Sequence, residues 1–208
     1  HVWAVGAMGL LLRYDGTSWA VEDGKTSSNL ASVWASDANN VWAVGAGGVI
    51  THYGSGGWAT QNSGTGNSLN GVFGSAANNV YAVGTGGVIQ RFDGSSWAGV
   101  SSPTAQTLAS IFGLAGNNIF AVGVGGTIAR YNGNSWSATI SGSANLLSVW
   151  ASDANNAWAV GQTGTIRKWD GSQWTAQTSN TSSNLRGVFG TSASSVFAVG
   201  FAGTVLFQ

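Results

Sequence analysis

The stretch Val41-Trp42-Ala43-Val44-Gly45 decides the fold, because the chain contains six versions of it. The versions begin at residues 2, 41, 80, 119, 157 and 196, so consecutive starts lie 38 or 39 residues apart. Such regular self-similarity is the signature of a repeat architecture, in which each repeat is one structural unit. We therefore expect a chain of similar units, each about 39 residues long.

Each repeat divides into four short stretches of strand character separated by turn signals. In one copy they cover residues 30–35, 41–45 and 49–53 and a stretch that begins at Trp58. In four other copies an Asp-Gly or Asn-Gly pair joins the last two stretches, which is a strong hairpin signal. No 3.6-residue apolar period persists, so no helix is expected.

Four antiparallel strands with apolar residues on both faces are typical of one blade of a β-propeller. The predicted fold class is all-β: a β-propeller of four-stranded antiparallel blades, in six radial sheets of which the first and last are incomplete. The alternative is five closed blades, in which residues 185–189 complete the N-terminal sheet and surplus strands remain at the C-terminus. Because both ends fall inside a repeat, we expect residues 1–208 to form a single propeller domain cut from a longer chain.

The segment Tyr14-Asp15-Gly16-Thr17-Ser18-Trp19 resembles the Asp-box hairpin of sialidase-like (BNR-type) propellers. The wider pattern of Trp-Ala-Val-Gly, Gly, Ile, Asp-Gly and Trp is similar to the photosystem II assembly-factor family of propellers and to related bacterial surface repeats. The chain departs from the Asp-box pattern, since Arg or Lys stands where Ser is expected two positions before the Asp. The resemblance implies a propeller fold over essentially the whole chain.

Four of the seven cations occupy one repeating position, and an Asp or Asn follows two residues later. The two positions change together: in the copy where Gly54 replaces the Asp, His52 replaces the cation. We interpret them as structural turn pairs joined by a charge-assisted contact. The functional alternative is a ring of cations that binds an anionic ligand. The pairs are Arg13 with Asp15, Arg91 with Asp93, Arg130 with Asn132, and Lys168 with Asp170.

Two aromatic positions also recur once per repeat, which favours packing between blades over stacking on sugar rings. The position that opens the fourth strand holds Trp19, Trp58, Trp97, Trp136 and Trp174. The position on the first strand holds Trp34, Phe73, Phe112, Trp150 and Phe189.

Composition excludes several classes of protein. Lys+Arg and Asp+Glu both number 7, only 7% of residues are charged, and cysteine is absent. A nucleic-acid-binding protein that neutralises phosphates would need a basic face, and thiolate chemistry would need cysteine. No apolar run approaches the length of a membrane-spanning helix.

Catalytic equipment is sparse. Glu22 is the only glutamate, and His1 and His52 lack companions for a catalytic triad. The sialidase resemblance implies an arginine triad and a Tyr–Glu pair. The tyrosines of this chain instead stand in repeating positions. Asp37 and Asp153 are interpreted as turn caps in preference to calcium ligands. We expect no enzyme activity, no catalytic residues, no cofactor and no metal site.

The expected function is a non-enzymatic binding or scaffold propeller of a bacterial secreted or surface protein that recognises carbohydrate or protein. The Ser/Thr/Asn-rich surface favours an extracellular, cell-surface or periplasmic location. The connections between repeats share one face with the turns after the second strands, and this face is the natural place for a ligand. The alternatives are a structural repeat that self-associates through unpaired strand edges, and a glycosidase-related propeller.

Overall fold

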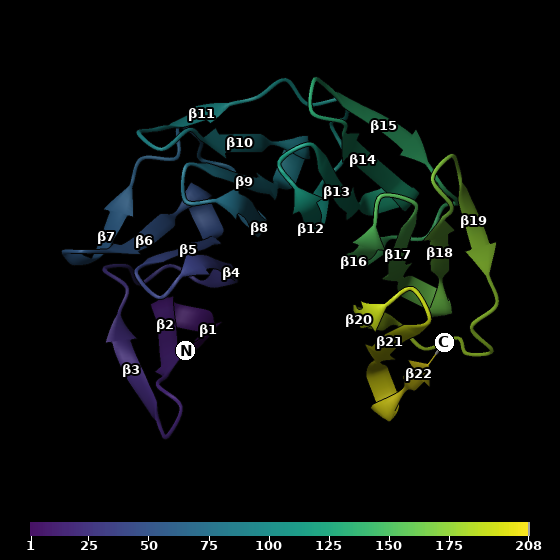
Figure 1. The fold of residues 1–208 in the computed structure, drawn as a ribbon, viewed down its shortest axis with the longest axis horizontal. Coiled ribbons are helices and arrows are strands. Elements are labelled where there is room, and N and C mark those ends of the chain that lie inside the picture. Colours follow the sequence, from purple (N-terminus) through teal and green to yellow (C-terminus); the bar gives the residue numbers. More distant parts are fainter. Residues whose placement is uncertain (208) are drawn as a thin grey trace. The chain divides into compact units, whose positions relative to one another are not determined.

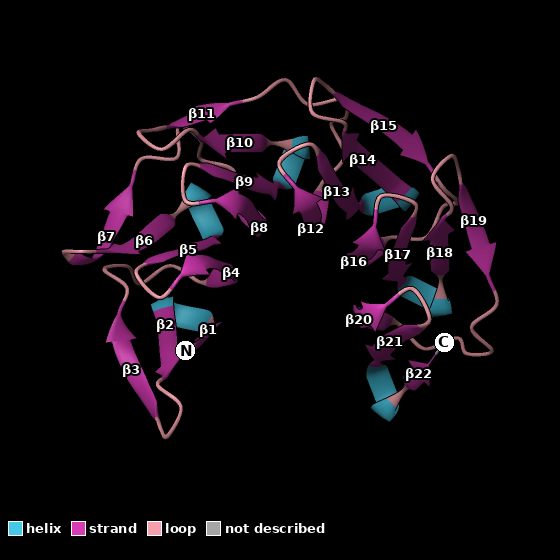
Figure 2. Cartoon of the chain, viewed as in Figure 1, coloured by secondary structure: helices cyan, strands magenta, loops and turns pink. Residues whose placement is uncertain are grey.

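The computed structural model describes residues 1–207, which fold into antiparallel sheets linked by turns and six single 3-10 turns (Figures 1 and 2). Each 3-10 turn follows the second strand of a sheet, or the first strand in the first sheet. No helix in this part of the chain has the length and apolar character needed to cross a membrane. The 3-10 turns are η1 (Ala7–Gly9), η2 (Ala46–Gly48), η3 (Thr85–Gly87), η4 (Val124–Gly126), η5 (Gln162–Gly164) and η6 (Phe201–Gly203).

The first compact unit, His1–Ser101, contains three sheets whose strands follow one another in chain order. The first sheet is β1 (Val2–Val5), β2 (Leu10–Tyr14) and β3 (Trp19–Asp23). The second is β4 (Leu30–Asp37), β5 (Asn40–Gly45), β6 (Ile50–Gly54) and β7 (Gly57–Gln61). The third is β8 (Leu69–Ala76), β9 (Asn79–Gly84), β10 (Ile89–Phe92) and β11 (Trp97–Gly99).

The second compact unit, Ser102–Gln208, repeats this design. The fourth sheet is β12 (Leu108–Ala115), β13 (Asn118–Gly123), β14 (Thr127–Tyr131) and β15 (Trp136–Ile140). The fifth is β16 (Leu146–Asp153), β17 (Asn156–Gly161), β18 (Ile166–Trp169) and β19 (Trp174–Gln177). The sixth is β20 (Leu185–Ser192), β21 (Ser195–Gly200) and β22 (Val205–Phe207).

The six-sheet prediction is confirmed, with three strands in the first sheet and three in the last. The strand predicted at residues 185–189 pairs with β21, as Phe189 opposite Phe197 shows, and not with the N-terminal sheet. The five-blade alternative is therefore wrong. The single-domain expectation stays a prediction.

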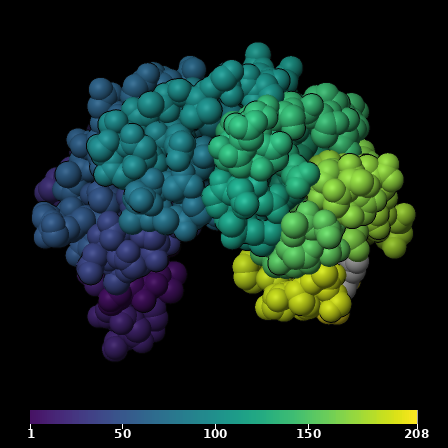
Figure 3. Space-filling model, turned by 45° about the horizontal axis from the view of Figure 1, so that its top comes forward, coloured from purple at the N-terminus to yellow at the C-terminus, as the bar shows by residue number. Residues whose placement is uncertain are grey.

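Within each unit the sheets pack face to face along their first strands, β4 against β8 in one unit and β16 against β12 and β20 in the other. Figure 3 shows the sixth sheet, in yellow, directly against the fifth, in green. The second strands β5 and β17 are almost completely buried, because neighbouring sheets cover both of their faces; Trp42 and Trp158 are each only 1% exposed. This packing explains why the second strands are apolar at every position rather than at alternate ones.

Candidate functional site

Five sheets carry a cation or histidine at the same position of the repeat, on strands β2, β6, β10, β14 and β18. In each, the side chain lies over an aromatic ring of the neighbouring strand. Cationic groups are attracted to the negative face of such rings. The distances to the ring centroid are 5.4 Å for Arg13 over Trp3, 5.8 Å for Arg91 over Tyr81, 5.5 Å for Arg130 over Phe120 and 5.2 Å for Lys168 over Trp158. His52 stacks on Trp42 at 4.3 Å.

Two of these cations also contact the next sheet. The Arg13 guanidinium lies 6.0 Å from the Tyr53 ring, and that of Arg130 lies 4.8 Å from the Trp169 ring. Both arginines bury Nε without a hydrogen-bond partner, as stacking between rings allows. These side chains therefore contribute to packing between sheets.

The imidazole of His52 is partly removed from water by its neighbours. Burial lowers the pKa of its imidazole, and the charge of Asp37 only partly opposes the shift. A buried charge without a close partner is unfavourable, so the neutral form of His52 is the one that fits between the rings.

The acidic partners of the predicted pairs cap their own turns. Each accepts two backbone N–H bonds through one side-chain oxygen, an arrangement typical of Asx turns. Asp93 Oδ1 accepts from the amides of Ser95 (2.9 Å) and Ser96 (3.0 Å), and Asp170 Oδ1 accepts from those of Ser172 (2.8 Å) and Gln173 (2.9 Å). The same bonds form at Asp15 and Asn132.

These amides also stabilise the ionised carboxylates. Backbone hydrogen bonds lower the pKa of Asp15, and together with the Ser95 and Ser172 hydroxyls they lower the pKa of Asp93 and of Asp170 to about 2. The cations have other polar partners: Arg13 lies 3.8 Å from Glu22, and Arg91 Nε donates to Asn79 Oδ1 at 2.9 Å. A direct contact between the cation and the carboxylate of one turn stays a prediction.

The tryptophans that open the fourth strands divide into buried and exposed members. Trp58 packs edge-on to Trp3 of the preceding sheet at 5.4 Å, and Trp174 packs against Phe120 of its preceding sheet at 5.6 Å. Trp97 is buried in one cluster with Trp42. Packing between sheets is thus confirmed for these three, but it is wrong for Trp19, whose ring is 52% exposed in the first sheet.

The first-strand aromatics show the same division. Trp34 stacks on Trp42 at 5.7 Å and contacts Phe73 of the next sheet at 6.1 Å. Trp150 likewise contacts Phe112 of the preceding sheet at 6.4 Å. The core assignment is wrong for Phe189, which is 64% exposed on the sixth sheet.

Asp37 and Asp153 cap the turns between first and second strands, as predicted. Asp37 accepts from the Asn39 amide at 2.8 Å and from Asn40 Nδ2 at 2.9 Å. Hydrogen bonds lower the pKa of Asp37, with the Asn39 amide as the largest cause, and that of Asp153, with Asn156 Nδ2 as the largest. Among residues 1–207, no three histidine or acidic side chains gather as a metal site requires, and the expectation of no metal stays a prediction.

The connections between sheets lie beside the 3-10 turns, as the predicted shared face requires. A side-chain oxygen just before a first strand accepts a hydrogen bond from the middle amide of the 3-10 turn in the preceding sheet. The bonds run to Asn29 from Met8 (2.8 Å), to Asn145 from Gly125 (2.9 Å), to Asn184 from Thr163 (2.9 Å) and to Ser68 from Gly47 (3.2 Å). These bonds join each sheet to the next within its unit.

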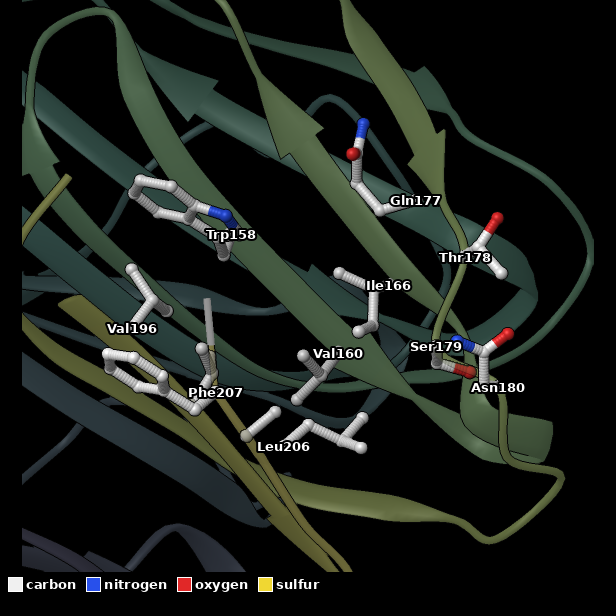
Figure 4. A pocket seen from close by; sticks show the side chains of 12 residues that line it. Trp158, Val160, Ile166, Gln177, Thr178, Ser179, Asn180, Val196, Leu206 and Phe207 are labelled. Carbon is white, nitrogen blue, oxygen red and sulfur yellow. The ribbon is translucent and has the colours of Figure 1, made fainter. Parts of the chain in front are cut away.

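A groove of about 340 Å³ opens between the fifth and sixth sheets (Figure 4). Its floor is apolar, with Trp158 and Ile166 from the fifth sheet facing Val196 and Leu206 from the sixth. Gln177 and the residues after it supply the polar rim. The volume falls within the range of small ligand-binding clefts. The sequence interpretation did not include this groove, although the three-stranded last repeat pointed toward it.

The chain is similar to solved β-propeller structures. It matches YCF48 bound to D1 peptide with a TM-score of 0.74 at 20% identity, covering 99% of this chain and 73% of that one. It matches YCF48 from Cyanidioschyzon merolae with a TM-score of 0.73 at 19% identity, covering 99% and 78%. It matches the WD40 β-propeller domain of Doa1 with a TM-score of 0.68 at 12% identity, covering 98% and 69%.

No protein-family model and no curated protein matches the chain. At sequence identities of 20% or less, these structural similarities show the fold alone. The six sheets are blades of a β-propeller fold.

Proposed function

We propose that this chain is a non-enzymatic scaffold that binds other proteins through the exposed face of its sixth sheet. Phe189, Phe197 and Phe207 lie opposite one another across the three strands, so their side chains form a row on one face. Val199 and Val205 form the next row. An apolar patch of this kind marks an interaction surface.

The main support for this proposal is the exposure of this face to solvent. Phe207 is 66% exposed and Val205 is 65% exposed, and the Phe197 and Phe207 rings lie 4.8 Å apart. Trp158 holds the position of Phe197 in the fifth sheet, and there it is buried against the sixth sheet. A partner that covers the sixth sheet therefore removes water from side chains that this fold elsewhere buries.

The comparisons support a protein ligand, since the YCF48 structure holds a D1 peptide on a fold similar to this one. The absence of catalysis is part of the proposal and rests on the acidic side chains, most of which cap turns as ionised acceptors. The extracellular location rests on the low charge and on the Ser/Thr/Asn-rich surface. Carbohydrate binding has weaker support, from the exposed Trp19 ring alone.

A random peptide library displayed on phage and selected on the purified chain tests the proposal. We expect enriched peptides that bind wild type and lose binding to the double variant Phe197→Ser, Phe207→Ser, which removes exposed side chains. Val21→Ser is the control, because Val21 is also an exposed apolar residue but belongs to a different sheet, the first. Enrichment of no peptide, or of peptides that bind the double variant equally well, would contradict the proposal.

Self-association is a second candidate, favoured by exposed apolar residues on the first sheet as well as the last. Trp19 and Val21 are exposed there, so two copies present different apolar faces to each other. Contacts between unlike faces are heterologous and build rings or filaments. Sedimentation of wild type should then show a mass that rises with concentration, and the double variant should remain monomeric.

A further inference from the structure

The chain contains two Asn-Gly pairs, and the structure places them in different surroundings. Asn70-Gly71 lies within the strand β8, where Gly71 is buried. Asn132-Gly133 lies in the hairpin turn between β14 and β15, and both of its residues are exposed. An Asn-Gly pair can react with itself, because the backbone nitrogen of the glycine can attack the side-chain amide of the asparagine. The two pairs therefore differ in how far the fold permits this reaction.

The backbone nitrogen of Gly133 is available for such an attack. Among residues 1–207 its N–H donates no hydrogen bond, since the turn is closed by the bond from the Asn132 amide to the Ser135 carbonyl at 3.3 Å. Gly133 has φ of 97°, and a Cβ added there would lie 2.8 Å from the Cβ of Asn117. The turn thus requires glycine at residue 133, and glycine has no side chain to crowd its own nitrogen.

Two backbone amides polarise the side-chain carbonyl of Asn132. Its Oδ1 accepts hydrogen bonds from the N–H groups of Asn134 and Ser135, each at 3.0 Å. When a nucleophile adds to Cγ, negative charge develops on Oδ1. Backbone N–H groups already directed at that oxygen stabilise the charge, as they do in an oxyanion hole. The turn therefore activates the amide of Asn132 toward attack.

We propose that Asn132 is a site of spontaneous deamidation in the folded chain. The Gly133 nitrogen loses its proton to hydroxide and forms a bond to Asn132 Cγ. The bond from Cγ to Nδ2 then breaks, and ammonia leaves with a proton taken from water. Water adds to one of the two carbonyls of the resulting five-membered imide and opens the ring to aspartate or isoaspartate. The net reaction is hydrolysis of one amide to a carboxylate and ammonium, without oxidation or reduction.

The aspartate product fits the turn that contains it. Three other turns carry an Asp at the corresponding position, and its Oδ1 accepts the same two amide bonds. A carboxylate accepts such bonds more strongly than an amide oxygen does. Isoaspartate instead lengthens the main chain by one atom between Tyr131 and Trp136, which lie opposite each other in the ladder. Deamidation to aspartate therefore preserves the hairpin, whereas isoaspartate disturbs it. The three turns are those of Asp15, Asp93 and Asp170.

The pair Asn70-Gly71 is a matched control within the same chain. Gly71 lies opposite Val83 in the ladder between β8 and β9. Closure of the imide ring needs a rotation of the backbone, and hydrolysis needs water, so a buried and paired strand must first open locally. We therefore expect Asn70 to react at least about tenfold more slowly than Asn132 in the folded chain.

The test incubates the whole chain at mildly alkaline pH, folded in one sample and unfolded by denaturant in another. Mass spectrometry of proteolytic fragments measures the rate at each asparagine. In denaturant the two pairs should react at similar rates, because both are then exposed. In the folded chain Asn132 should react no more slowly than in denaturant, since the turn amides stabilise the developing charge. Isoaspartate among the products identifies the imide route, because direct hydrolysis of the side chain gives aspartate alone.

Two variants complete the experiment. Asn132→Gln should lose the acidic species that ion-exchange chromatography separates from aged wild type, because ring closure from the longer side chain is slower. That variant keeps Asn134, so an acidic species that persists in it belongs to another residue and contradicts the assignment. Asn132→Asp has the aspartate product from the start, and its thermal midpoint should equal or exceed that of wild type.

The two rates at Asn132 decide the inference. Reaction at least about tenfold faster than at Asn70, and no slower than in denaturant, supports it. A smaller difference between the pairs, or a slower rate in the folded chain than in denaturant, overturns it, because the turn then protects Asn132. Aspartate without isoaspartate overturns the imide route. None of these results depends on the proposed protein-binding function, whose test uses the sixth sheet.

Discussion

Two neighbouring glycines in the turn η2 have similar backbone conformations but different surroundings. Gly47 has φ of 65° and Gly48 has φ of 76°, both in the left-handed region. A Cβ added to Gly47 meets nothing within 4 Å, whereas one added to Gly48 lies 2.1 Å from the carbonyl oxygen of Thr65. Other repeats place Met8, Thr163 and Ala202 at the Gly47 position. Only the Gly48 position therefore requires glycine for space as well as for φ.

We expect Gly47→Ala to lower the free energy of unfolding by about 1 kcal/mol, the usual difference for a left-handed residue. Gly48→Ala should lower it by about 3 kcal/mol or more, because a backbone carbonyl must also move. Denaturant unfolding of both variants measures the difference. Gly203→Ala is a further control, since that glycine has φ of 71° and open space. Equal effects at positions 47 and 48 would show that the Thr65 contact is not tight.

At the scale of the element, the hairpin turn between β10 and β11 depends on one carboxylate. Asp93 Oδ1 accepts bonds from two amides and from Ser95 Oγ (2.7 Å), and its pKa is lowered to about 2. Because the folded pKa lies below the ordinary value of 3.8, the ionised form stabilises the fold fully above pH 3.8. That contribution is lost as the pH falls from 3.8 toward 2.

Asp93→Ala should therefore lower the thermal midpoint at pH 7 by about 2–4 °C. Asp93→Asn should lower it less, since Asn132 makes the same two amide bonds in its own turn. Calorimetry between pH 5 and about pH 2 should show the gap between wild type and Asp93→Asn shrinking across the titration. A difference in thermal midpoint that stays constant with pH would mean that the negative charge of Asp93 does not contribute to stability.

The strands and turns can be predicted from the sequence, but the burial of a side chain cannot be predicted where it depends on a neighbouring sheet. The Asp-Gly pairs specify hairpins locally, and the repeat spacing specifies six sheets, so both were predictable. Trp19 and Phe189 share positions with buried residues, yet they are exposed in the first and last sheets. A repeating position indicates which way a side chain faces, but not whether another sheet covers it.

At the scale of the whole molecule, burial falls from inner sheets to terminal ones although the repeats are alike. β17 and β21 are the second strands of the fifth and sixth sheets, and both pair with strands on either side. In β17 every residue after Asn156 is buried, whereas Phe197 and Val199 of β21 are exposed. In a repeat protein, stability is the sum of each repeat and its interfaces, so a sheet with one covered face is held more weakly.

Amide hydrogen exchange should therefore be at least about tenfold faster in β21 than in β17, despite equal backbone pairing. The same comparison holds between β1 and β5, although β1 is also an edge strand, so β21 is the cleaner probe. Exchange followed by mass spectrometry resolves both strands, and Phe197→Ser should leave β17 unchanged. Equal protection of β17 and β21 would mean that something covers the sixth sheet in solution. A dilution series would then separate a second copy, whose protection fades with concentration, from a contact within one chain, whose protection does not.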